Sequence, residues 1–188
     1  KFYGLNLTIE TLDGLIKHNG PVKNVTSYKK ILKKDLFNNK ITFNNFPSLE
    51  AQVAAISDDI AYNNHDLEDG LRADLFTIKK FSSIPFVSQL INKHVKNLKN
   101  FRREIIISQI IRDLINLMVV DVINTANRNL KKSNPQSIKD IFKQDCLIVD
   151  FSDKMKRIDD QIKGFLKRNM YNHKKVIVNT NRGKRIIK

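Results

Sequence analysis

One segment limits what this chain can fold into: residues 105–123 are apolar on most sides of a helix. We expect this helix to cover residues 101–132 and to lie inside the protein, because a helix that is apolar all round avoids water. Arg112, Asp113 and Asp121 interrupt the segment at intervals too short for a bilayer crossing. The segment therefore predicts a buried central helix that does not span a membrane.

The rest of the sequence also favours helices. The expected helices cover residues 8–19, 47–76, 85–99, 136–142 and 152–171, with a break at Gly70 as an open alternative. Residues 21–46 are expected to be irregular apart from a small helix near 28–36, and the tail 172–188 is left open as a strand, a loop or a disordered segment. No period of about 20 to 50 residues repeats and β-branched alternation is scarce, so the predicted fold class is all-α.

We expect one all-α region over residues 1–188, with the 41% hydrophobic content of a globular protein. Residues 1–76 carry the candidate site, residues 77–172 form a helical remainder, and residues 173–188 form a basic tail. The start of the sequence lacks the apolar core and cleavage site of a signal peptide. The single cysteine, Cys146, excludes an internal disulfide and fits a reducing cytoplasm.

The net charge of +15 is unevenly distributed along the chain. Residues 58–74 hold six acids and one base, Arg72, which leaves +20 on the rest. A field of this sign favours polyanionic partners such as single-stranded nucleic acid, nucleotides or an anionic membrane surface. A genome biased toward Lys, Asn and Ile would give the same composition, so both interpretations stay open.

Several kinds of site are absent from the sequence. One cysteine and four scattered histidines give no zinc-binding spacing, and the six glycines never approach a phosphate-binding loop. No G-x-S-x-G motif marks a nucleophilic serine. Carboxylates are therefore the best chemical asset of the chain, because hard divalent cations prefer oxygen ligands.

Asp58, Tyr62 and Asp66 stand four residues apart within the acidic segment. On a helix they form a row about 12 Å long, because each residue advances the helix by about 1.5 Å. Asp58 is the candidate metal ligand, while Tyr62 and Asp66 can hydrogen-bond a sugar hydroxyl. The alternative is a solvated acidic face, the commoner meaning of clustered charge. An apolar stripe behind the row is expected to face the core: Leu49, Val53, Ile56, Ile60 and Leu67.

Two strings of this sequence resemble the deoxyguanosinetriphosphate triphosphohydrolase-like branch of the HD-domain phosphohydrolases: Gly4-LNLTIETLDGLIKHNG-Pro21 and Glu50-AQVAAISDDIAYNNHDLEDG-Leu71. Weaker similarity through Phe101-RREIIISQIIRDL-Ile115 and Arg168-NMYNHKK-Val176 extends the resemblance to essentially the whole chain. It implies an all-α, HD-domain-like helical bundle that is cytoplasmic and commonly a homo-oligomer. Such an enzyme splits a deoxynucleoside triphosphate into deoxynucleoside and triphosphate with a divalent cation, Mg²⁺ or Mn²⁺.

Residue roles follow from the resemblance position by position. Asp58 matches the last Asp of a metal site that the family builds from two His and two Asp on separate helices. Tyr62 and Asp66 match positions that contact the sugar. Arg102 and Arg103 fall near positions that line the nucleotide pocket.

The upstream His and the His-Asp doublet of that metal site have no counterpart in this sequence. The His65-Asp66 doublet does not replace them, because it lies inside the string that matches the last-Asp motif. We therefore expect a C-terminal portion of such an enzyme, with little or no turnover alone. The alternative is a non-catalytic nucleic-acid-binding or regulatory helical module.

Overall fold

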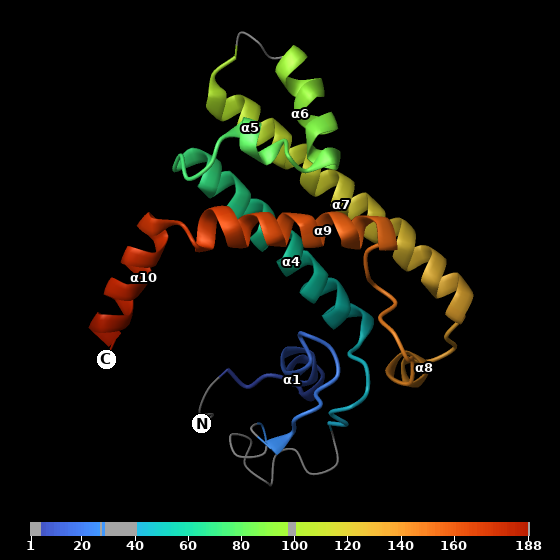
Figure 1. Ribbon diagram of the computed structural model, residues 1–188. Helices are drawn as coiled ribbons and strands as arrows, with labels where there is room; N and C mark the ends of the chain where they lie inside the picture. Colours follow the sequence, from blue (N-terminus) through green and yellow to red (C-terminus); the bar gives the residue numbers. More distant parts are fainter. Residues whose placement is uncertain (1–4, 27, 29–40, 98–100, 188) are drawn as a thin grey trace. The chain divides into compact units, whose positions relative to one another are not determined.

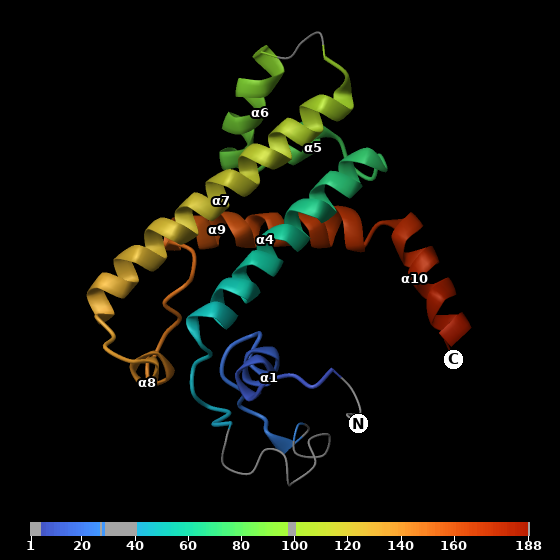
Figure 2. The same ribbon diagram turned by 180° about the vertical axis from the view of Figure 1, so that it is seen from behind.

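The computed structural model describes residues 5–26, 28, 41–97 and 101–187. In this part of the chain there are eight α-helices, one π-helical turn and no strand, which confirms the all-α fold class (Figure 1; Figure 2). The small helix expected near residues 28–36 lies, apart from residue 28, outside the described residues. None of the helices described combines the length and apolar character needed to cross a bilayer.

The helices begin and end close to the residues that the sequence suggested. Their bounds are α1 Ile9–Ile16, α4 Leu49–Arg72, α5 Ile78–Phe81, α6 Pro85–Asn97, α7 Arg103–Ser133, α8 Ile138–Phe142, α9 Asp153–Leu166, the π-helix η1 Lys167–Tyr171, and α10 Lys174–Ile187. Thr8, Thr77 and Ser152 cap α1, α5 and α9, since each side chain accepts a hydrogen bond from a backbone N–H of the first turn.

The tail is the largest correction to the sequence-based fold, because residues 174–187 form helix α10 and not a strand, loop or disordered segment. Its β-branched residues, two asparagines and Gly183 all have low helix propensity, which concealed the helical pattern. The short helix α5 was also missed. Four residues are too few for a periodic signal.

Helix α4 ends at Arg72, four residues before the predicted end, and Gly70 does not break it. Asp74 adopts a positive φ of 53°, while the N–H of Leu75 donates to the carbonyl of Gly70 at 2.9 Å. This is a Schellman-type helix end, which turns the chain back on itself. A Cβ on Gly70 would lie 2.2 Å from the Phe76 ring, so glycine allows the returning chain to pack against the helix.

The chain forms two compact units, Lys1–Asp58 with Val122–Asp150, and Asp59–Asp121 with Phe151–Lys188. In the first unit, the buried side chain of Gln52 organises the start of α4. It donates to the carbonyl of Pro47 at 2.9 Å and accepts from the N–H groups of Ile148 and Val149 at 2.9 and 3.0 Å. These bonds tie the segment that precedes α9 to the first turn of α4.

In the second unit, α9 crosses α4 (Figure 1). Most of the buried apolar side chains of this unit come from α4, α6, α7 and α9. Phe165 of α9 lies at the centre of an aromatic cluster, with ring centroids 4.9 Å from Phe76 and 5.5 Å from Phe81. The end of α9 is thereby anchored against the turn that follows α4.

The apolar stripes are only partly buried as predicted. On α4, Ile60 and Leu67 lie in the core, but Val53 is 49% exposed. On α7, one face is buried, while Val120 and Ile123 are about half exposed at 45% and 52%. Helix α7 is therefore an amphipathic helix in this structure and not an element buried on all sides.

Candidate functional site

Asp58, Tyr62 and Asp66 all lie on α4, as the spacing predicts. The side chain of Asp58 is 69% exposed and Tyr62 is 59% exposed, so this face of the helix is open to a ligand. Asp66 is half-buried. The row of Asp58, Tyr62 and Asp66 is thus accessible from solvent. It differs from an ordinary acidic face because other parts of the chain place residues beside it.

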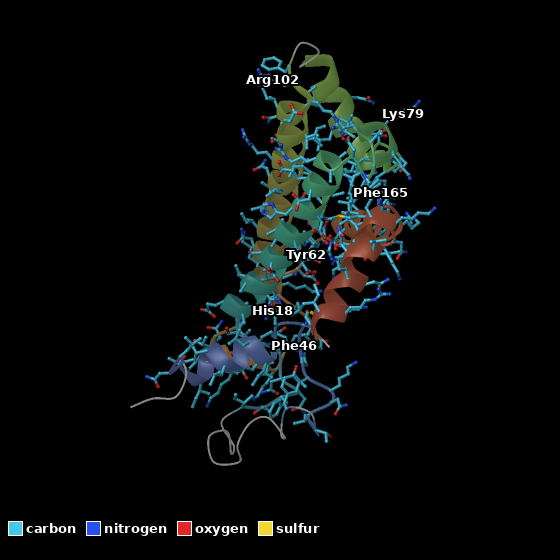
Figure 3. The ribbon with its side chains drawn as sticks, turned by 90° about the vertical axis from the view of Figure 1, so that its left-hand side faces the viewer. His18, Phe46, Tyr62, Lys79, Arg102 and Phe165 are labelled. Carbon is cyan, nitrogen blue, oxygen red and sulfur yellow. The ribbon has the colours of Figure 1, made fainter. Side chains whose placement is uncertain are left out.

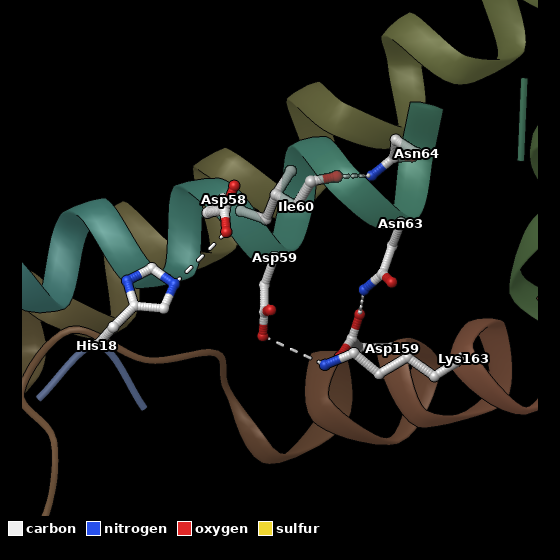
Figure 4. A network of polar contacts seen from close by, with 8 residues as sticks. All are labelled: His18, Asp58, Asp59, Ile60, Asn63, Asn64, Asp159 and Lys163. Carbon is white, nitrogen blue, oxygen red and sulfur yellow. Dashed lines mark hydrogen bonds and ion pairs between the residues drawn. The ribbon is translucent and has the colours of Figure 1, made fainter. Parts of the chain in front are cut away.

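The carboxylate of Asp58 has a histidine beside it. Nε2 of His18, which follows α1, lies 3.4 Å from Oδ2 of Asp58 (Figure 4). Both side chains are exposed, so this is a weak surface contact by itself. Imidazole and carboxylate are nevertheless both ligand types that divalent metals use.

These two groups alone do not fit the metal that the resemblance implies. A divalent cation in a protein needs several ligands, and in the described part of the chain no group of three or more His, Cys, Asp or Glu is arranged to hold one. Asp58 can supply a single carboxylate oxygen. The other ligands would have to come from outside the described residues.

Asp66 is joined to a residue from the far end of the chain. The phenol of Tyr171, the last residue of η1, donates a hydrogen bond to Oδ2 of Asp66. Burial, followed by the carboxylate of Asp66 and the hydroxyl of Tyr62, raises the pKa of Tyr171 well above its usual range. Tyr171 therefore stays protonated and remains a donor at any physiological pH, next to an acceptor carboxylate.

Tyr171 was not singled out from the sequence. It lies in the string 168–176 that resembles the family, and this was the one signal that could have marked it. A tyrosine among Arg, Asn and Lys is otherwise an ordinary surface residue. Its contact with Asp66, 105 residues away, depends on how α9 and η1 lie on α4.

A polar cluster lies beside the row, where α9 crosses α4, with two buried members and two that are at least partly exposed. Nδ2 of Asn63 donates to Oδ1 of Asp159 at 3.1 Å, and Nζ of Lys163 lies 2.8 Å from Asp159 and 3.3 Å from Asp59 (Figure 4). Asn63 and Asp159 are only 4% and 5% exposed. Burial raises the pKa of Asp159 in spite of Lys163, while the two carboxylates outweigh burial and raise the pKa of Lys163.

The two arginines lie away from the row. Arg103 donates to the carbonyl of Leu71 at 2.8 Å and pairs with Asp74 at 2.8 Å, so it holds the turn at the end of α4. Arg102 is exposed just before the start of α7. It lies far from Tyr62 (Figure 3). The structure brings Tyr62, Asp66 and Tyr171 together, and it does not bring Arg102 or Arg103 to them. Their role in nucleotide binding stays a prediction.

Comparison with known proteins adds independent support for the family. No family model matches the chain. The chain is 49% identical to a deoxyguanosinetriphosphate triphosphohydrolase-like protein of Pelagibacter ubique (strain HTCC1062), over 187 residues that cover 100% of this chain and 50% of that relative. Proteins of the same name from Bartonella henselae and Brucella ovis are 40% and 38% identical over 99% of this chain and 48% of their own length.

The alignment covers 100% of this chain, so it includes the α4 row and the string that holds Tyr171. The chain spans about half the length of the curated relatives it matches. By these matches, the chain is similar over its whole length to about half of proteins named deoxyguanosinetriphosphate triphosphohydrolase-like protein.

Proposed function

We propose that this chain is the part of a deoxynucleoside triphosphate triphosphohydrolase that binds the sugar of the nucleotide and supplies one carboxylate ligand to a divalent cation, Mg²⁺ or Mn²⁺. The observation that carries the proposal is the hydrogen bond from Tyr171 to Asp66 beside Tyr62. The name of the relatives supports a deoxynucleoside triphosphate as substrate and hydrolysis as the reaction.

The three residues offer complementary hydrogen-bonding groups to a sugar. A carboxylate only accepts hydrogen bonds, and with two oxygens Asp66 can accept from a sugar hydroxyl as well as from Tyr171. The phenols of Tyr62 and Tyr171 can donate or accept. This combination suits the free 3′-hydroxyl of a deoxyribose, which donates one hydrogen bond and accepts another.

Asp58 is the proposed contact to the metal. When bound, a divalent cation would polarise the phosphate and activate the attacking water. Asp58 lies two helical turns before Asp66, about 12 Å along the axis, a separation that suits phosphates at one end of a nucleotide and sugar at the other. Because the described residues do not complete the metal site, we expect this chain alone to show little or no turnover.

Binding of deoxyguanosine and dGTP to the purified chain tests the sugar site. We expect Asp66→Asn and Tyr171→Phe to weaken binding by about tenfold, as loss of a hydrogen bond to a charged group implies. Asp69→Asn, an exposed acid on the same helix, is the matched control and should leave binding unchanged. Equal affinity in all three variants, measured by saturation-transfer NMR, would exclude the sugar site.

A second function is favoured by helix α10, which carries five Lys or Arg residues and no acid. We propose that it contacts single-stranded nucleic acid through phosphate charges. Binding should weaken steeply as salt is raised, because each neutralised phosphate releases counterions. Replacing Lys174, Lys175, Arg182 and Arg185 with Gln should abolish binding, whereas Asp58→Asn should not affect it.

We also propose a cytoplasmic homo-oligomer. The support is the half-exposed apolar residues of α7, Val120 and Ile123, and the free, exposed thiol of Cys146, which suits a reducing compartment. Light scattering coupled to size exclusion tests the association. A monomer at micromolar concentration would exclude it for this chain.

A further inference from the structure

We propose that Asp159 is a positioning residue: its buried contact with Asn63 fixes α9 on α4 at the angle that brings Tyr171 to Asp66. The contact is not itself part of the sugar site. Only its consequence for nucleotide binding rests on the proposed function.

The same two helical segments are joined at two places. Asn63 and Asp66 lie on α4, and Asp159 and Tyr171 lie on the continuous run of α9 and η1. Asn63 meets Asp159 where the helices cross, and Asp66 meets Tyr171 at the end of η1. The first contact is buried and the second is partly exposed, so the first can serve as the fixed point.

The distances along the helices make the second contact sensitive to the first. Tyr171 follows Asp159 by 12 residues, about 18 Å of helix. A rotation of α9 by about 5° around the crossing would then move Tyr171 by about 1.5 Å, enough to break a hydrogen bond. The angle at the crossing therefore has to be set closely for Tyr171 to reach Asp66.

The cluster has the geometry to set that angle. Asp59 and Asn63 are one turn apart on α4, and Asp159 and Lys163 are one turn apart on α9. Asn63 bonds Asp159 in the core and Lys163 bonds Asp59 at the surface, so two neighbouring contacts join the helices at successive turns. Apolar packing is non-directional, whereas two hydrogen bonds side by side resist both sliding and rotation.

Burial makes it costly to break the hydrogen bond between Asn63 and Asp159. Asp159 and Asn63 are nearly inaccessible to water, and a buried polar group without a partner costs about 1–3 kcal/mol or more. Any rotation that separated them would leave the Asn63 amide without this acceptor in the core and would leave Asp159 with Lys163 of its own helix as partner. The helix crossing is thereby held in one arrangement and not merely packed.

The π-helical turn η1 also contributes to the position of Tyr171. It follows α9 directly and ends at Tyr171. Its wider turn changes the direction in which Tyr171 projects, compared with a continued α-helix. Such turns are frequent at functional sites, because they redirect a side chain without moving the helix that carries it.

The test follows the ionisation of Tyr171 by NMR of tyrosines labelled at ¹³Cζ, with Tyr171→Phe to assign the signal. In the unchanged chain, Tyr171 should stay protonated beyond pH 10, where free tyrosine titrates. In Asp159→Leu it should titrate near the ordinary value, and Asp159→Asn, which keeps an acceptor for Asn63, should restore the original behaviour. Asp160→Asn, exposed on the same helix, is the matched control.

Far-UV circular dichroism checks that each variant is folded. If Asp159→Leu does not fold, Asn63→Ser removes the same contact with a smaller change in shape, and the same loss is expected. A folded variant that lacks the contact between Asn63 and Asp159, but in which Tyr171 titrates as in the unchanged chain, would overturn the proposal.

Binding of deoxyguanosine is measured in parallel and should weaken about tenfold with the loss of the Tyr171 contact. If Tyr171 is released but binding is unchanged, the positioning role holds and the proposed sugar site fails.

Discussion

Tyr171 and Asp66, 105 residues apart, are joined by a hydrogen bond from the phenol to the carboxylate. The bond links the end of η1 to the middle of α4, and burial together with Asp66 raises the pKa of the phenol. Folding therefore favours the protonated form of Tyr171. This has a consequence for stability at alkaline pH as well as for ligand binding.

The first prediction concerns that alkaline range. The folded-state pKa of Tyr171 lies above the unfolded value, about 10, so its contribution to stability is fully present below pH 10 and is lost as the pH rises further. Urea unfolding at pH 9 and pH 11 should show a smaller drop in the free energy of unfolding for Tyr171→Phe than for the unchanged chain. Equal drops would mean that folding does not raise the pKa of Tyr171 through burial and Asp66.

The second prediction compares two helical glycines. A Cβ on Gly70 would lie 2.2 Å from the Phe76 ring, so Gly70→Ala must displace Phe76 from its contact with Phe165. We expect a loss of about 1–3 kcal/mol in the free energy of unfolding, in spite of the higher helix propensity of alanine. Gly183, in α10, has nothing within 4 Å of such a Cβ.

Gly183→Ala is the matched control, and it should be neutral or stabilising by up to about 1 kcal/mol. Both variants are measured by urea unfolding. A Gly70→Ala variant as stable as the original would show that Phe76 does not pack on α4 in solution.

The third prediction separates the two arginines. Arg103→Ala removes the bonds to Leu71 and Asp74 that hold the end of α4, and we expect a loss of about 1 kcal/mol in the free energy of unfolding. Arg102→Ala should change it by less than about 0.5 kcal/mol, because Arg102 is exposed before the helix begins. A selective loss of dGTP affinity in either variant, at unchanged stability, would instead support the nucleotide role that the resemblance implies.

The helices that could be predicted from the sequence are those with a 3.6-residue pattern and a recognisable start. Thr8 and Ser152 cap helices as side chains of their type do, and the α4 row follows from spacing alone. The end of α4 was misplaced because it depends on Asp74 adopting a positive φ, which aspartate tolerates but does not require. Helix α10 was missed because individual propensities argued against it.

The candidate site also has a part that could be predicted from the sequence and a part that could not. Asp58, Tyr62 and Asp66 share one helix, so local geometry was enough to group them. Tyr171 meets Asp66 only because of the crossing of α9 and α4, which depends on tertiary contacts such as Asn63 with Asp159. Local sequence carries no signal for the angle between two helices.

The last prediction concerns Asp58 and turnover. Because Asp58 supplies only one ligand and the described residues contain no complete metal site, purified residues 1–188 should release little or no triphosphate from dGTP with Mg²⁺ or Mn²⁺. Weak binding of Mn²⁺ near Asp58 should still broaden the NMR signals of His18, whose Nε2 lies 3.4 Å from the carboxylate. Asp58→Asn should remove this broadening and Asp69→Asn should not. Robust triphosphate release that disappears with Asp58→Ala would contradict the prediction, since it would mean that this chain completes the metal site with its own residues.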